Sequence, residues 1–352
     1  MIIKKKNIFV NKPILIHVGW AKAASTFLQE SILINSPNTL YLGRPLPKFY
    51  KKDSYEYKKG MIYEKVKKFI YTYDEPFFNV IKNKKLHEII SDLNSLIKPD
   101  INQIIISDEG FTNLGSNTKS DRGRKADRLK LLFPKAKILF IIREQSKIIE
   151  SMYGNYLRIA NRHIPFITFK EYINISNCLF NDEFSKIQNK KGIIKDKYLK
   201  IIFSSYFGNP LCVPLYNEVI TYYENLFGKE NIHISLFENL IRQTEKEIKT
   251  ISKETGFNIS QPIKVNYTRN TSMPNSYDLI HFFLRKYFFF NLFFKIVTKL
   301  GIEKLIHQLL RYFGNRINLK WPEENKKNIL KKYSEGNKNL ANRYKLDLKN
   351  YF

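Results

Sequence analysis

A short segment near the N-terminus, PILIHVGWAKAASTFLQE (residues 13–30), constrains the fold more than any other part of the sequence. Its mainly apolar run at residues 14–18 predicts a short buried strand, and a helix is expected from Ser25 onward. Gly19 allows the backbone to turn tightly between the two. The free N–H groups and the positive dipole end of a helix start favour an anion at such a turn. We therefore expect a phosphate-binding loop.

The lysine of this loop is displaced from the usual nucleotide-binding pattern. In G-x-x-x-x-G-K-S/T the lysine directly precedes the hydroxyl residue, whereas Lys22 stands three residues after Gly19 and three before Ser25. Lys22 can supply a point charge, and Ser25 and Thr26 can supply hydroxyl donors. The loop alone is also compatible with an ordinary strand-to-helix turn that carries a solvated lysine.

Further strands and helices alternate along the chain. Apolar runs at residues 102–107, 137–142 and 231–236 predict three more buried strands. Helical spacing is found at residues 86–97, 146–160, 215–227, 244–257 and 323–344. Strands that alternate with helices predict an α/β fold with a central parallel sheet flanked by helices, a P-loop-like three-layer sandwich with a helical C-terminal extension.

The strand at residues 137–142 adds a second basic residue to the expected site. Arg143 follows this strand directly, and Ser151 follows eight residues later on the next helix. Ligands of open parallel sheets bind at the carboxyl ends of the strands, so Arg143 is expected at the same edge as the loop. Its planar fork suits a second phosphate. A salt-bridged arginine and an ordinary helix serine remain the alternative.

Taken together, these segments resemble the sulfotransferases that use 3′-phosphoadenosine 5′-phosphosulfate (PAPS). The first signature of that family is a strand followed by G-x-x-K-x-x-S-T before a helix, and the second is an arginine at a strand end with a serine eight residues on. The segment FGKENIHISLFENL also resembles the family, and the C-terminal segment resembles bacterial members that act on glycans. The resemblance covers residues 13–30, 103–160 and 215–260, and the tail only loosely.

The resemblance implies PAPS as co-substrate and no metal. It assigns the 5′-phosphosulfate to the loop, and the expected binding residues there are Gly19, Lys22, Ala23, Ala24, Ser25 and Thr26. It assigns the 3′-phosphate to Arg143 and Ser151. Many members carry a further basic residue in a late loop, for which Arg269 is the candidate. The R-K-G-x-x-G-x-W pattern of the small-molecule branch is absent, which argues against a phenol or steroid acceptor. The resemblance to members that act on glycans implies a hydroxyl or amine of a cell-surface carbohydrate as the acceptor.

The resemblance also implies a general base just after the second strand, where family members have a histidine or a glutamate. The segment IIISDEGF offers Asp108 and Glu109 and no histidine. Glu109 is the expected base because it matches the S-x-E-G pattern of bacterial members, with Asp108 as the alternative and His163 as a remote one. Glu109 is also compatible with a role as a first-turn helix acid.

Composition restricts the partners without choosing among them. The chain has 352 residues with 60 Lys and Arg against 32 Asp and Glu, a net charge of +28, which favours anionic ligands. Two cysteines, Cys178 and Cys212, form neither a disulfide framework nor a zinc site. We expect a cytoplasmic enzyme that does not bind nucleic acid. A nucleotide kinase and a non-enzymatic basic protein that binds membranes or nucleic acid are the alternatives.

The expected domains are a catalytic α/β domain at residues 1–275 and a helical extension at residues 276–352. Residues 44–85 and 161–215 are rich in Tyr and Lys, and we expect them to form the acceptor site. The basic, Phe-rich stretch at residues 276–313 suits a core helix or a dimer surface, and a contact with an anionic membrane surface is the alternative.

Overall fold

The computed structural model describes residues 11–44, 54–112, 121–159, 167–181, 183, 210–261, 321 and 323–351. The chain divides into two compact units. The first comprises Met1–Arg143 and Tyr216–Asn266, and the second comprises Glu144–Leu215 and Tyr267–Phe352. The predicted domain boundary between residues 275 and 276 lies outside the described residues and stays a prediction.

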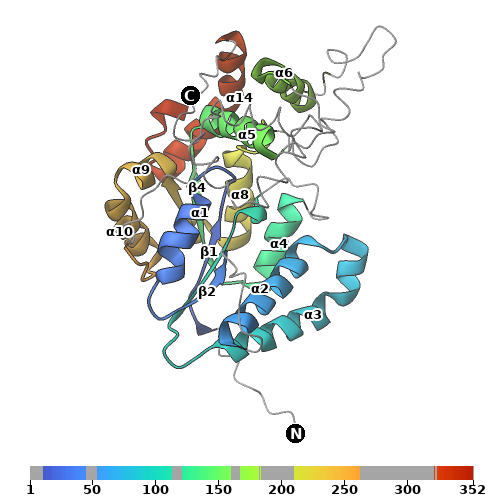
Figure 1. Cartoon of the computed structure of the whole chain (residues 1–352), viewed down its shortest axis with the longest axis vertical. Helices are drawn as coiled ribbons and strands as arrows, with labels where there is room; N and C mark the ends of the chain where they lie inside the picture. The colour runs from blue at the N-terminus through green and yellow to red at the C-terminus, as the bar shows by residue number, and fades with distance from the viewer. Residues whose placement is uncertain are drawn as a thin grey trace, which may run out of the picture. The chain divides into compact units, whose positions relative to one another are not determined.

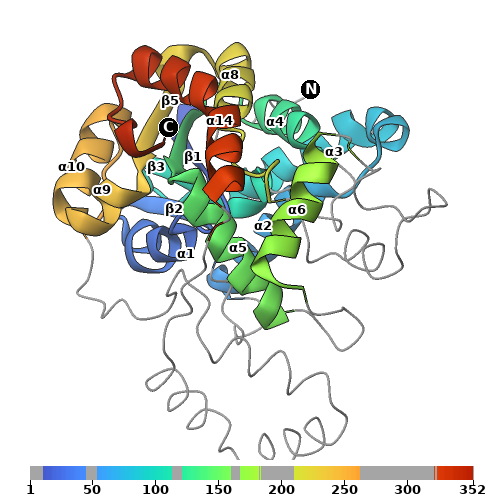
Figure 2. The same cartoon turned by 90° about the horizontal axis from the view of Figure 1, so that it is seen from above.

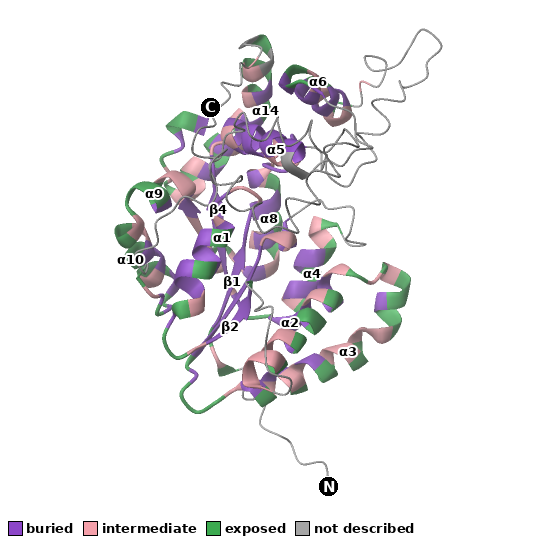
Figure 3. Cartoon of the chain, in the orientation of Figure 1, coloured by how far each residue is buried: buried purple, intermediate pink, exposed green. Residues whose placement is uncertain are grey.

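The first unit is built on a five-stranded sheet with the order β2-β3-β1-β4-β5, in which all paired strands are parallel. The strands are β1 (Ile14–Val18), β2 (Thr39–Gly43), β3 (Gln103–Asp108), β4 (Lys137–Ile142) and β5 (Ile232–Leu236). They are buried along most of their length (Figure 3), as expected for a parallel sheet covered on both faces.

Helices cover both faces of this sheet. Figures 1 and 2 show α1 (Ser25–Phe27) and α10 (Thr244–Thr255) on one side, and α2 (Tyr55–Tyr71), α4 (Arg122–Leu132) and α8 (Tyr216–Phe227) on the other. The short helix α9 (Phe237–Arg242) follows β5, and α3 (Glu75–Leu96) packs against α2. The predicted α/β class, a P-loop-like three-layer sandwich, is confirmed.

The helices on the second face begin at polar caps. Ser54, Asp74 and Asp121 precede α2, α3 and α4, and each side chain accepts a hydrogen bond from a backbone N–H of the first turn. These caps fix the first residues of α2, α3 and α4. Helix α4 thus starts at Arg122, in the connection that follows β3.

The predicted strands at residues 14–18, 102–107, 137–142 and 231–236 are confirmed to within one residue. The edge strand β2 was not predicted, because its sequence, TLYLG, has only three consecutive apolar residues between a threonine and a glycine. The helix predicted at residues 86–97 is the second half of the longer α3, and α2 lies in a stretch without a clear sequence period.

The second unit contains α5 (Gln145–Ile159), α6 (Phe169–Phe180) and α14 (Glu323–Tyr344). A cluster rich in tyrosine fills it, with Tyr153, Tyr156 and Tyr172 in mutual ring contact. Trp321 joins this cluster, donating a hydrogen bond to Glu150. The predicted helical C-terminal extension is confirmed in α14. Residues 276–313 lie outside the described residues, and no helix in the described part of the chain is long and apolar enough to cross a bilayer.

Candidate active site

The chain leaves β1 at Gly19, where the neighbouring atoms leave no room for a side chain. A methyl group on Gly19 would lie 2.5 Å from the Ser25 hydroxyl oxygen and 3.2 Å from both Cα and Cβ of Glu109. The Thr112 hydroxyl donates a hydrogen bond to the Gly19 carbonyl. The start of the loop is therefore in direct contact with the segment that follows β3, and Glu109 lies beside it.

The loop that follows has an unusual backbone. Lys22 and Ala24 have φ angles of 68° and 61°, in the left-handed region that residues with a side chain rarely adopt. The Ala23 N–H and the Ser25 hydroxyl both donate to the Trp20 carbonyl, each at 3.2 Å. Left-handed non-glycine residues cost free energy and tend to occur at functional sites, where the surrounding structure holds them in place.

The helix expected after the loop is irregular. Its α-helical part, Ser25–Phe27, continues as a π-helix at Leu28–Ile32 and a 3₁₀ turn at Leu33–Asn35. Ser25 is buried, with its hydroxyl turned onto the Trp20 carbonyl, whereas Thr26 is exposed. Of the two expected hydroxyl donors, only Thr26 is therefore on the surface.

Trp20 and Tyr216 anchor the loop, and neither was predicted from the sequence. The Trp20 ring is fully buried and packs edge-on against Tyr216, with ring centroids 4.7 Å apart, and against Phe140 of β4 at 5.2 Å. The Tyr216 hydroxyl accepts a hydrogen bond from the Arg143 N–H and donates one to the Arg143 carbonyl. The tryptophan directly after the glycine was the available sequence signal for this anchor.

Arg143 lies at the end of β4, next to the loop, as the sequence predicts. Its Nη1 donates a hydrogen bond of 2.8 Å to the Lys22 carbonyl, and its guanidinium lies 4.3 Å from the centroid of the Phe237 ring. The connections that follow β1 and β4 lead toward opposite edges of the sheet, to β2 and to β5. Such a switch point is where ligands bind in open α/β sheets.

The two acidic residues at the end of β3, Asp108 and Glu109, have different environments. Both carboxylate oxygens of the buried Asp108 accept hydrogen bonds, one from the Gly110 N–H at 2.8 Å and one from the Tyr63 hydroxyl at 2.6 Å. Burial raises the pKa of the partly exposed Glu109, and the Asp108 charge raises it further, while Lys22 and Arg44 oppose both. A raised pKa brings Glu109 closer to the range in which a carboxylate is an effective general base.

A cluster of three buried polar side chains lies behind the loop, on the sheet. His17 Nδ1 is 2.7 Å from the Ser107 hydroxyl, which also accepts a hydrogen bond of 2.9 Å from the Gln29 side chain. Burial lowers the pKa of His17 to about 3, so its imidazole is neutral at pH 7. The group links β1, β3 and the helical segment after the loop.

The structure gives less support to the other expected site residues. Ser151 is buried on α5 and belongs to the second unit, whereas the loop and Arg143 belong to the first. Arg269 and His163 lie outside the described residues. In the described part of the chain, no group of three or more His, Cys, Asp or Glu side chains is arranged to hold a metal ion.

Comparisons with known proteins give weak likenesses to sulfotransferases. No family model matches the chain, and no curated protein matches it. Among solved structures, a sulfotransferase from Alicyclobacillus acidocaldarius has 14% identity and a TM-score of 0.41, covering 73% of this chain and 87% of its own. The sulfotransferase domain from the curacin biosynthetic pathway has 14% identity and a TM-score of 0.35, and the match covers 77% of this chain and 81% of that domain. A mouse sulfotransferase in complex with PAP has 12% identity and a TM-score of 0.30, covering 78% and 66%. Values this low do not assign the chain to a family.

Proposed function

We propose that the chain is a sulfotransferase that moves the sulfuryl group of PAPS to a hydroxyl group of a carbohydrate acceptor. The observation that carries the proposal is the 2.8 Å hydrogen bond from Arg143 to the Lys22 carbonyl at the switch point of the sheet. It joins two residues that bind anions, one on the loop after β1 and one at the end of β4. PAPS carries a phosphosulfate and a separate phosphate, and such a ligand needs two anion sites on one edge.

The loop holds the 5′-phosphosulfate in this proposal. Lys22 supplies the charge, the backbone N–H groups of Ala23 and Ala24 and the hydroxyl of the exposed Thr26 supply donors, and Gly19 keeps the approach open. Ser25, whose hydroxyl is bonded to the Trp20 carbonyl, contributes its backbone N–H and the shape of the loop. Arg143 binds the 3′-phosphate, with Ser151 and Arg269 as further residues proposed on the resemblance alone.

The transfer step needs a base on one side of sulfur and a cation on the other. Glu109 takes the proton of the acceptor hydroxyl as the new oxygen–sulfur bond forms. The bond between sulfur and the bridging oxygen breaks, and the electron pair stays on that oxygen, which leaves with 3′,5′-adenosine bisphosphate. Lys22 and the amides at the helix start stabilise the negative charge that builds there. The contact between Gly19 and Glu109 supports this assignment, since it keeps base and loop adjacent.

Asp108 is a less suitable base than Glu109. Its two carboxylate oxygens already accept hydrogen bonds from the Tyr63 hydroxyl and the Gly110 N–H, whereas a base needs an oxygen that faces the acceptor. The net charge of +28 suits an acceptor with acidic groups. The described part of the proposed acceptor segments includes α2, which contributes Tyr63 to the end of β3.

Binding of 3′,5′-adenosine bisphosphate tests the proposal. At about 100 times its Kd, the ligand is expected to stabilise the protein by about 2.7 kcal/mol, which raises the Tm of a chain of this length by about 4 °C. Lys22→Ala removes a charge-assisted contact, so calorimetry is expected to show binding about 10–100 times weaker. Lys85→Ala, which removes an exposed lysine paired with Glu88 on α3, is the matched control and is expected to bind like wild type.

Other ligands separate the alternatives in the same assay. Stabilisation by ATP with Mg²⁺ and not by the bisphosphate would replace the proposal with a kinase. Stabilisation by duplex DNA or by anionic vesicles alone would replace it with a non-enzymatic binder.

A further inference from the structure

Lys125 is a buried lysine on α4 that the reaction described above does not use. The residue is 0% exposed, and its Nζ donates a hydrogen bond of 3.1 Å to the carbonyl of Gly110, the residue directly after Glu109. The same Nζ lies 5.4 Å from the centroid of the Tyr71 ring on α2. Lys125 therefore reaches from α4 to the segment that carries the proposed base.

Arg122, one turn earlier on α4, reaches the same segment. Its Nε donates a hydrogen bond of 2.6 Å to the Thr112 carbonyl, and the Thr112 hydroxyl in turn donates to the Gly19 carbonyl. Lys125 and Arg122 thus hold two carbonyls of the short 3₁₀ turn Glu109–Phe111 and the residue after it. The contacts form a continuous path from α4 through this turn to the loop after β1.

The charge on Lys125 is held in an unfavourable place. The pKa of Lys125 is lowered to about 8, first by burial and then by the charge of Arg122, while Asp108 and Asp121 oppose both. A buried charge is weak support for stability, because an apolar side chain of similar volume often serves as well. What its ammonium does provide is a specific contact with the neighbouring turn, the hydrogen bond to the Gly110 carbonyl.

We propose that Lys125 is a positioning residue for the sulfuryl transfer, whose ammonium holds the Gly110 carbonyl and so keeps the Glu109 carboxylate against the loop that carries Lys22. This inference rests on the proposed function and extends it to a residue outside the proposed PAPS-binding site. Lys125 acts through Gly110, and it touches neither PAPS nor the acceptor.

The proposal predicts a specific dependence on pH. The charged and titratable groups that face Lys125 are Asp121 and Arg122 on α4, Asp108 on β3 and Tyr71 on α2. Above about pH 8 the lysine loses its proton and its charge, the hold on Gly110 weakens, and the rate is expected to fall. An arginine stays charged throughout this range, so Lys125→Arg is expected to keep its rate up to pH 9.5.

Three variants of the full chain test the inference. The measurement is release of 3′,5′-adenosine bisphosphate from PAPS between pH 6 and 9.5, with water and with 4-nitrophenyl glycosides as acceptors, and binding of the bisphosphate by calorimetry. Lys125→Met is expected to lower kcat at least 10-fold while the Kd for the bisphosphate changes less than 3-fold. Lys130→Met is the matched control, since Lys130 also donates to a backbone carbonyl, that of Pro134, from the same helix.

The outcomes separate this inference from the proposed function. If wild type neither binds the bisphosphate nor releases it from PAPS, the proposed function fails and this inference fails with it. If wild type is active and Lys125→Met matches Lys130→Met, only the inference fails. It fails equally if Lys125→Arg retains the decline above pH 8, or if Lys125→Met lowers kcat only in proportion to a loss of folded protein seen by circular dichroism.

Discussion

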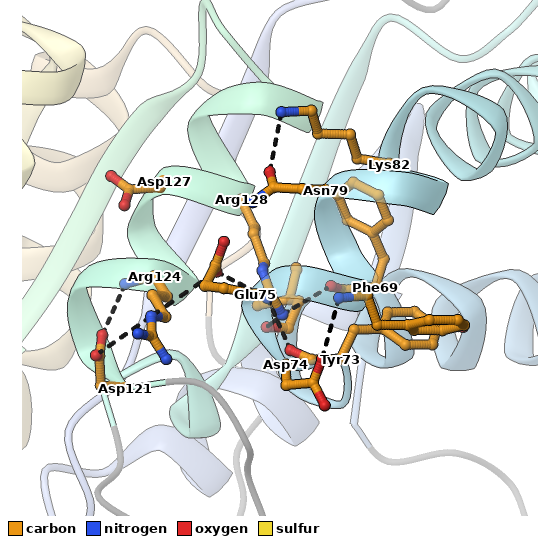
Figure 4. Close-up of polar contacts among 12 residues, drawn as sticks. Phe69, Tyr73, Asp74, Glu75, Asn79, Lys82, Asp121, Arg124, Asp127 and Arg128 are labelled. Carbon is orange, nitrogen blue, oxygen red and sulfur yellow. Dashed lines mark hydrogen bonds and ion pairs between the residues drawn. The ribbon is translucent and has the colours of Figure 1, made fainter.

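Two buried cations three residues apart on α4, Lys125 and Arg128, have opposite surroundings. Arg128 donates from Nη1 to the Ile70 carbonyl at 3.2 Å and from Nη2 to the Tyr73 carbonyl at 2.7 Å and a Glu75 carboxylate oxygen at 3.0 Å (Figure 4). Its guanidinium also lies 3.9 Å from the Phe78 ring centroid. Lys125, by contrast, faces a turn that carries acidic residues, and its pKa is lowered to about 8.

The difference shows two uses of a buried charge. Arg128 fastens α4 to the connection between α2 and α3, and the planar fork of an arginine suits several acceptors at once. A lysine offers a single ammonium, whose pKa shifts readily when it is buried. We therefore expect substitutions of Arg128 to act on stability and substitutions of Lys125 to act on the rate of transfer.

The largest expected effect is that of Arg128→Met on folding. The substitution leaves the Ile70 and Tyr73 carbonyls without their donor, and a buried acceptor left without a hydrogen bond costs about 1–3 kcal/mol. Urea unfolding followed by circular dichroism measures the loss. Turnover per folded molecule is expected to match wild type, and a loss below 1 kcal/mol would contradict the role given to Arg128.

A smaller effect is expected from the titration of Lys125. Its pKa is lowered from 10.5 to about 8 in the folded protein, so between these values the unfolded chain binds more protons and the free energy of unfolding rises with pH. The rise from this group is at most about 1.4 kcal/mol per pH unit. This rise is measured as the pH dependence of the difference in unfolding free energy between wild type and Lys125→Met. The contributions of the other titratable groups are common to both proteins and cancel in the difference. A difference that is constant from pH 8 to 10 would contradict the lowered pKa.

The smallest effect is expected from Glu75→Gln. This substitution removes the carboxylate charge near Arg128 and leaves the backbone carbonyls in place. Because the Glu75 side chain is 35% exposed, the ion pair is partly screened and its loss is expected to cost about 1 kcal/mol or less. If Glu75→Gln destabilised the protein as much as Arg128→Met, the ion pair and not the carbonyl contacts would hold α4.

The sequence predicted the parts of the fold that depend on residues adjacent in the chain. The apolar runs identified four of the five strands, and the strand–glycine–helix pattern located the loop. Arg143 followed from the rule that parallel strands end at one edge, whereas Asp108 and Glu109 were chosen on the family resemblance. Edge strand β2 was missed because its apolar run is only three residues long, LYL, between Thr39 and Gly43.

The contacts between distant residues were not accessible from sequence. The Trp20–Tyr216 packing and the Lys125–Gly110 hydrogen bond join segments far apart in the chain, and nothing local to Tyr216 or Lys125 indicates them. The Ser25 hydroxyl was expected to face a ligand, yet it bonds to the Trp20 carbonyl within its own loop. Left-handed backbone at Lys22, a residue that disfavours it, likewise follows from the packed loop and not from its identity.

If Lys22 and Arg143 bind anions as proposed, the hydrogen bond from Arg143 to the Lys22 carbonyl couples the two sites. An anion that reorients the guanidinium also acts on the Lys22 peptide, and by thermodynamic linkage the loop acts equally on the arginine. Two separate fragments, each with one phosphate, would therefore bind with free energies that do not simply add. The site would then respond to the spacing between two anions carried on one molecule, a property that separates a bisphosphorylated nucleotide from the more abundant mononucleotides.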